Sequence, residues 1–124
     1  MNKERTQNLL RSCQEIGAKK VIYVSSSSIY GVPKQNPVLE TTAPNPMEDY
    51  GKAKYEGELL CREYAKKGLD VSIIRPRTIL GHGRLGIFSI LFEWIYQGAN
   101  IPVLEHGNNI YQFVHANDLA DSCI

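Results

Sequence analysis

Apolar positions along the first part of the chain alternate between helical spacing and short continuous runs. Residues 3–16 carry apolar side chains at helical spacing before a glycine, and residues 20–24 form a β-rich run that is apolar on both faces. Such a run is typical of a strand buried on both sides in a parallel sheet. A second helix is expected over about 50–67 and a second buried strand over 71–74. This order predicts an α/β fold with a doubly wound parallel sheet.

The second part of the chain predicts shorter elements. Three glycines in residues 81–86 indicate a loop, with no suitable strand expected before it, and residues 87–97 form a very apolar helix. Short strands are expected over 101–104 and 110–114, and a last helix from about Asn117. Two long strands do not complete a doubly wound sheet. We therefore expect either a segment of a larger protein, which we favour, or a chain that pairs with something else.

Composition narrows the class of protein. The chain has 124 residues, 43% of them hydrophobic, and a net charge of +1, which is ordinary for a globular domain. No block of like charges favours nucleic acid or an anionic membrane, and the longest apolar stretch, 87–96, has about half the length of a membrane span. The amino terminus has no apolar stretch typical of a signal peptide. Three scattered cysteines without a CxxC pair indicate reduced thiols in a cytoplasmic protein and no metal site.

The YGKAK sequence at 50–54 is the first candidate for chemistry. Tyr50 and Lys54 are four residues apart, so a helix places them on one face. A phenol has an ordinary pKa of about 10, and a neighbouring ammonium lowers that pKa toward the range of a general base. The alternative is structural: Lys52 or Lys54 merely solvates the helix, and Tyr50 packs at its start.

Four serines, residues 25–28, follow directly after the first predicted strand. In open α/β sheets, ligands bind at the carboxyl ends of the strands, where a hydroxyl can donate to a substrate oxygen. In the alternative reading, the serines hydrogen-bond their own backbone in a polar loop. The second strand ends in Arg75-Pro76 at the same edge, so three signals converge there.

Together these motifs resemble the extended short-chain dehydrogenase/reductase family, also called the NAD-dependent epimerase/dehydratase family. Its members show a serine-rich strand end before Tyr-Gly, a YGxxK helix, Arg-Pro at the next strand end, a later glycine and a His-x-x-Asp-Leu-Ala segment. Here these motifs fall on 24–31, 50–54, 75–76, Gly81 and 114–120. The resemblance covers essentially the whole chain, in order.

The resemblance implies a catalytic set and a cofactor, NAD or NADP. Tyr50 is the implied acid/base, Lys54 lowers its pKa and binds the nicotinamide ribose, and Ser26 is the catalytic hydroxyl, with Ser27 as second choice. The implied cofactor-binding residues are Ser25, Tyr50, Lys54, Pro76, Arg77 and Thr78. The implied substrate-binding residues are Ser26, Ser27, Arg84 and Tyr111.

Two departures from the family pattern bear on the function. The glycine-rich GxxGxxG turn that holds the cofactor pyrophosphate is absent from the chain. Many sugar-nucleotide enzymes of the family carry arginine where this chain has Tyr111, and a tyrosine cannot replace that charge. A nucleotide-sugar substrate is therefore left open, with Arg77 or Arg84 as a substitute cation.

The implied organisation is a partial Rossmann-like domain. Residues 1–80 form the second part of an NAD(P)-binding domain with the catalytic residues, and residues 81–124 an incomplete substrate-binding region. The implied function is hydride transfer at a hydroxyl or carbonyl carbon of a small molecule, by an enzyme that is a homodimer at full length. The alternatives are a non-catalytic member of the fold that senses dinucleotide or binds a protein, and an inactive truncated product.

Three further residues have mainly structural interpretations. Cys61 is expected to be packed inside the second helix, with no base to make it a nucleophile. His115 is expected to cap or brace the turn before the last helix, and Glu40 to pin the proline-rich loop by a hydrogen bond to backbone.

Overall fold

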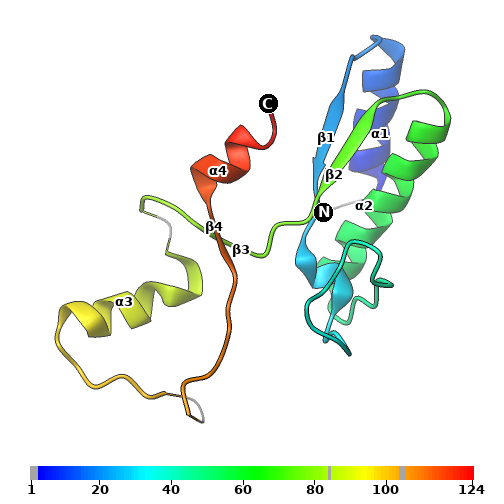
Figure 1. The fold of residues 1–124 in the computed structure, drawn as a ribbon. Coiled ribbons are helices and arrows are strands. Elements are labelled where there is room, and N and C mark those ends of the chain that lie inside the picture. The colour runs from blue at the N-terminus through cyan, green and yellow to red at the C-terminus, as the bar shows by residue number, and fades with distance from the viewer. Residues whose placement is uncertain (1–2, 84, 104–105) are drawn as a thin grey trace. The chain divides into compact units, whose positions relative to one another are not determined.

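The structure is a computed structural model that describes residues 3–83, 85–103 and 106–124 (Figure 1). It divides into two compact units, 1–76 and 77–124, which are described separately below. The division falls between Pro76 and Arg77, four residues before the boundary placed after residue 80 from the sequence.

The first unit is a two-stranded parallel sheet with two helices. Its elements are α1 (Lys3–Glu15), β1 (Val21–Val24), the 3-10 helix η1 (Ser27–Tyr30), α2 (Asp49–Lys66) and β2 (Val71–Ile74). Val21 pairs with Val71, and Val24 pairs with Ile74. The helices α1 and α2 lie side by side against the strands (Figure 1). The expectation of strands buried on both faces is wrong for this structure, because no residue of β1 or β2 is fully buried.

The core of this unit lies between the helices and the sheet. It is formed by Leu10, Leu60, Cys61, Tyr64 and Leu69, each at most 7% exposed. Alternate strand residues, such as Val21 and Ile73, pack against it, which follows from the two-residue period of a strand. Cys61 is fully buried, as its position in the second helix led us to expect.

Two glycines let the backbone approach itself closely next to β1. Gly31 has φ +60°, and a Cβ there would lie 2.3 Å from the Asn45 carbonyl oxygen. A Cβ at Gly51 would lie 2.7 Å from the carbonyl oxygen of Ser28 in η1. Glycine at 51 therefore allows the first turn of α2 to rest on η1, and this fixes where the residues around it can point.

The second unit is smaller. Its elements are β3 (Thr78–Leu80), the 3-10 helix η2 (Gly86–Phe88), α3 (Ser89–Tyr96), β4 (Phe113–His115) and α4 (Ala116–Asp121). The strands β3 and β4 are parallel, with Thr78 opposite Phe113. No described residue of this unit is buried.

Three expectations about the second unit are corrected. The strand β3 ends at Leu80, so a strand does precede the glycines of 81–86. Its three residues are too few to show a period in the sequence. Residues 101–103 form no strand, residue 104 lies outside the described residues, and β4 begins only at Phe113. Within the described part of the chain, no helix is long and apolar enough to cross a membrane.

Candidate active site at the carboxyl end of β1

The Lys54 ammonium is the centre of the candidate site. Its Nζ donates a hydrogen bond to the Val24 carbonyl oxygen, at 2.8 Å, at the last residue of β1. The same nitrogen lies 5.6 Å from the ring centroid of Tyr23 and 5.8 Å from that of Tyr50. Both distances are within the range of a cation–π interaction. Lys54 is thus held at the sheet edge beside two phenol rings.

Close approach of α2 to β1 produces this arrangement. Tyr50 and Lys54 are one helical turn apart and lie on the same face. A Cβ at Gly57 would lie 2.0 Å from the Tyr23 hydroxyl oxygen, so glycine leaves room for this side chain. The Tyr23 hydroxyl in turn donates to the Lys54 carbonyl oxygen at 3.4 Å. The backbone and the side chain of Lys54 are therefore both fixed to β1.

The two phenols beside Lys54 have different environments. Burial, followed by the nearby Cys61 and Glu58 groups, raises the pKa of Tyr23 to about 12, so this phenol stays protonated at neutral pH. Tyr50 is 57% exposed and open to a ligand. Burial lowers the pKa of Lys54 from its ordinary value. Of the two rings, Tyr50 is therefore the more accessible one.

The serine run connects the carboxyl ends of the two strands. The Ser25 backbone N–H donates to the Ile74 carbonyl oxygen at 2.7 Å, and the Ser27 N–H donates to the Pro76 carbonyl oxygen at 3.0 Å. Ser26 caps η1, and its Oγ accepts a hydrogen bond from the Ser28 N–H at 3.2 Å. At Ser26 the structure therefore shows the hydrogen bond of the alternative interpretation, in which the serines bond to the backbone of their own loop. That bond leaves the Ser26 hydroxyl proton available to another acceptor.

Predicted site residues also meet within the second unit. The Arg77 guanidinium carbon lies 5.2 Å from the ring centroid of Tyr111, and Thr78 Oγ1 donates to the Tyr111 hydroxyl at 3.3 Å. Tyr111 also contacts the rings of Phe88 and Phe113, at 5.5 and 5.1 Å between centroids. Arg77 therefore places a cation on the Tyr111 ring. Arg84 lies outside the described residues.

The sequence did not point to the Arg75–Glu58 ion pair. Two parallel hydrogen bonds join the Arg75 guanidinium to the fully buried Glu58 carboxylate, at 2.8 and 2.6 Å. Glu58 follows Lys54 by one helical turn, a spacing that was available as a signal. Arg75 stood out in the sequence at the end of the second strand, but its pairing with Glu58, 17 residues away, depends on the fold.

The structure tests the three structural interpretations. His115 Nδ1 accepts a hydrogen bond from the Asn117 N–H and caps α4, as predicted. Cys61 is packed as predicted, and burial first, and the nearby Glu58 second, raise its pKa to about 11. The prediction that the Glu40 side chain pins the loop is wrong. Its backbone carbonyl, rather than its side chain, pins the loop by accepting a hydrogen bond from Arg75.

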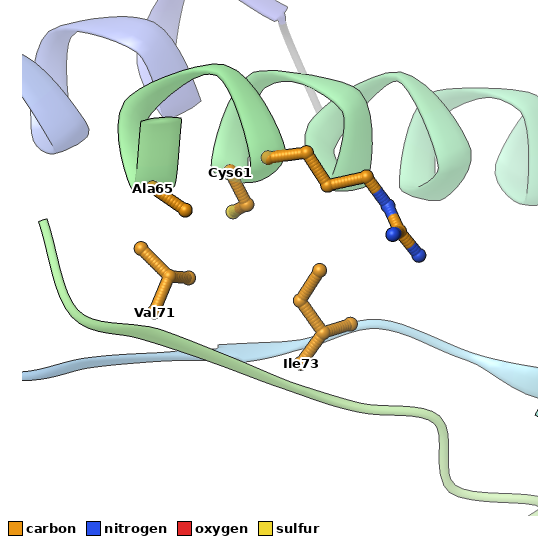
Figure 2. A pocket seen from close by; sticks show the side chains of 5 residues that line it. Cys61, Ala65, Val71 and Ile73 are labelled. Carbon is orange, nitrogen blue, oxygen red and sulfur yellow. The ribbon is translucent and has the colours of Figure 1, made fainter. Parts of the chain in front are cut away.

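A depression of about 280 Å³ lies elsewhere in the first unit, between α2 and β2. Figure 2 shows Cys61 and Ala65 of α2 facing Val71 and Ile73 of β2, and Arg62 also lines the depression. None of the predicted catalytic residues lines it. Within the described residues, no group of His, Cys, Asp or Glu side chains is arranged to hold a metal ion.

Parallel strands, a hydroxyl-bearing turn at their carboxyl ends, and a phenol and an ammonium on the next helix define a partial Rossmann-like α/β domain. All 124 residues match the family model described as the NAD dependent epimerase/dehydratase family. The chain therefore belongs to that family, whose name states its dependence on NAD.

Individual relatives match most of this chain. The uncharacterized protein y4nG of Sinorhizobium fredii (strain NBRC 101917 / NGR234) is 54% identical over 120 residues, which are 96% of this chain and 30% of that protein. N-acetyl-alpha-D-glucosaminyl-diphospho-ditrans,octacis-undecaprenol 4-epimerase of Escherichia coli O157:H7 is 30% identical over 92% of this chain and 38% of its own length.

A solved structure shows the same fold. UDP-glucuronic acid 4-epimerase from Bacillus cereus, in complex with NAD, superimposes with a TM-score of 0.77 and 32% identity, over 92% of this chain and 38% of that chain. The chain thus spans between 30% and 38% of the length of these relatives.

Proposed function

We propose that this chain is the part of an NAD(P)-dependent epimerase, dehydratase or reductase that carries its acid/base residues, Ser26, Tyr50 and Lys54. The observation that carries the proposal is the placement of the Lys54 ammonium. It is anchored on the Val24 carbonyl oxygen and lies 5.8 Å from the centre of the exposed Tyr50 ring. A cation fixed beside an accessible phenol stabilises the phenolate, which is the form that removes a proton.

The donor set at this edge fits a dinucleotide. An ammonium has three N–H donors, and the Val24 carbonyl oxygen takes one from Lys54. The remaining donors suit the hydroxyl groups of a ribose. A bound nicotinamide supplies the site with an acceptor and donor of hydride.

Each of the three residues then has its own role in the proton transfer. The Tyr50 phenolate takes the proton of a substrate hydroxyl as the carbon that bears it loses hydride, and Lys54 offsets the negative charge on Tyr50 before the transfer. The Ser26 hydroxyl donates a hydrogen bond to the forming carbonyl oxygen. Tyr50 would then return the proton to that oxygen, and hydride from a bound nicotinamide would reach the other face of the carbon to give the epimer.

A nucleotide sugar is the substrate class that we favour. The relatives in Escherichia coli and Bacillus cereus are, by name, epimerases of diphosphate-linked sugars. In this chain the Arg77 guanidinium on the Tyr111 ring supplies the cation that a phosphate group requires.

The test is a Tyr50→Phe substitution in the longer protein that contains this segment. We expect turnover to fall by about 10²–10⁴-fold because the acid/base group is lost, with cofactor affinity retained. Tyr55→Phe, on the same helix, is the matched control and should retain the parental turnover. Near-normal turnover of the Tyr50→Phe enzyme would refute the assignment.

A further inference from the structure

One side chain, Arg75, joins four segments of the first unit. Besides its paired bonds to Glu58 in α2, its Nη1 donates to the Tyr30 hydroxyl at 2.6 Å and to the Glu40 carbonyl oxygen at 3.2 Å. The guanidinium carbon also lies 5.3 Å from the ring centroid of Tyr30. The residue after β2 is therefore bonded at once to the catalytic helix, to η1 and to the proline-rich loop.

Stability alone is a poor explanation for this network. Glu58 is fully buried, and the Arg75 side chain is 14% exposed. Removing two charges from water is costly, and apolar residues of similar volume often replace such a pair without loss of stability. The carboxylate nevertheless stays ionised. Burial acts to raise the pKa of Glu58, but hydrogen bonds, chiefly from Arg75, and the charges of Arg75 and Arg62 outweigh burial and lower that pKa overall.

The bonded elements are the ones that carry the proposed catalytic groups. Tyr50, Lys54 and Glu58 follow one another at intervals of one turn along one face of α2. Tyr30 ends the 3-10 helix that Ser26 begins as its cap. A planar guanidinium fork bonded to both elements fixes their separation and their rotation more strictly than an apolar contact.

We propose that Arg75 is a positioning residue, whose fork sets α2 against η1 so that Lys54 reaches the Val24 carbonyl oxygen and Tyr50 lies on the serine side of the sheet. The inference rests on the proposed function for its purpose. The geometry it predicts can be measured in the 124-residue chain without substrate or cofactor.

The test removes both charges in the double variant Arg75→Met/Glu58→Leu and follows the titration of Lys54 by NMR of its side chain. In the parent, burial holds the pKa of Lys54 below its ordinary value. We expect the double variant to fold, and the pKa of Lys54 to rise toward about 10.4 as the ammonium leaves Val24 for water. Lys20→Met, which removes the exposed Lys20–Asp70 pair, is the control and should leave the Lys54 titration unchanged.

A second variant makes the result decisive if the double variant does not fold. Tyr30→Phe removes a single hydroxyl and keeps the ion pair, and we expect a smaller shift in the same direction. A Lys54 titration equal to that of the parent, in the folded double variant or in Tyr30→Phe when it alone folds, would overturn the positioning role. Loss of turnover in Tyr50→Phe bears only on the proposed function, so the two proposals fail separately.

Discussion

The two units of the chain use their apolar sequence in different ways. Every buried residue that the structure describes lies in the first unit, where α1 and α2 cover the β1–β2 sheet. In the second unit, the apolar helix α3 has Ile90 at 61% and Tyr96 at 88% exposure, and none of its residues is buried. Apolar sequence thus produces burial only where a second surface is available to cover it.

The same contrast holds for the predicted site residues. In the first unit, Lys54 is fixed by its hydrogen bond to Val24 and by two rings. In the second unit, Arg77 and Tyr111 contact each other at an exposed position. The first unit therefore holds a predicted site residue through several contacts, whereas the pair in the second unit is exposed.

The largest effect on stability should come from the core of the first unit. Leu10→Ala removes a side chain that is 1% exposed and should lower the free energy of unfolding by about 2–5 kcal/mol. Leu9→Ala is a matched control on the same helix, because Leu9 is 61% exposed and its loss should cost little. Urea denaturation measures both. Equal losses for the two variants would show that the packing of α1 differs from that described.

A smaller effect should appear on acidification. The pKa of Glu58 is lower in the folded chain than in the unfolded chain, so its contribution to stability is complete above the ordinary glutamate value of about 4.3. That contribution is lost as the pH falls through the folded-state pKa. Urea midpoints measured from pH 7 to about pH 3 should therefore fall more steeply for the parent than for Glu58→Gln.

Glu56→Gln is the control for this experiment, since Glu56 is exposed on the same helix. It should keep the pH dependence of the parent. A parent and a Glu58→Gln variant with parallel pH profiles would contradict an ionised, buried carboxylate at position 58.

The smallest effect is expected in the second unit. Ile90→Gln, on the exposed face of α3, should change the free energy of unfolding by less than about 0.5 kcal/mol. Sedimentation of the same samples checks that the chain is monomeric. A large loss of stability in a monomer would mean that another surface covers α3. The two units would then differ less in burial than described here.

Local pattern predicted most of the first unit and little of the second. The strand over 71–74 was predicted residue by residue, because it is an apolar run that a proline follows closely. The second helix was predicted to within one residue at each end, because it is long and a glycine follows it. The N-cap of that helix is Glu48, and Asp49 lies in its first turn. The strand β3 has three residues, too few to repeat a pattern.

The candidate site shows the same limit. Helical spacing placed Tyr50 and Lys54 on one face, and the structure agrees. Spacing within one element cannot identify partners contributed by others. The second ring beside Lys54, Tyr23, lies 31 residues away, and the partner of Glu58 follows another loop and strand. Such contacts depend on how the chain returns to the sheet.

The bare backbone at Gly51 has a practical consequence for anyone who alters this protein. A methyl group there would meet the Ser28 carbonyl oxygen at 2.7 Å and displace the turn in which Tyr50 stands. Libraries aimed at new substrates should therefore keep position 51 fixed. The neighbouring Lys52 is exposed and can be varied without moving α2 away from η1.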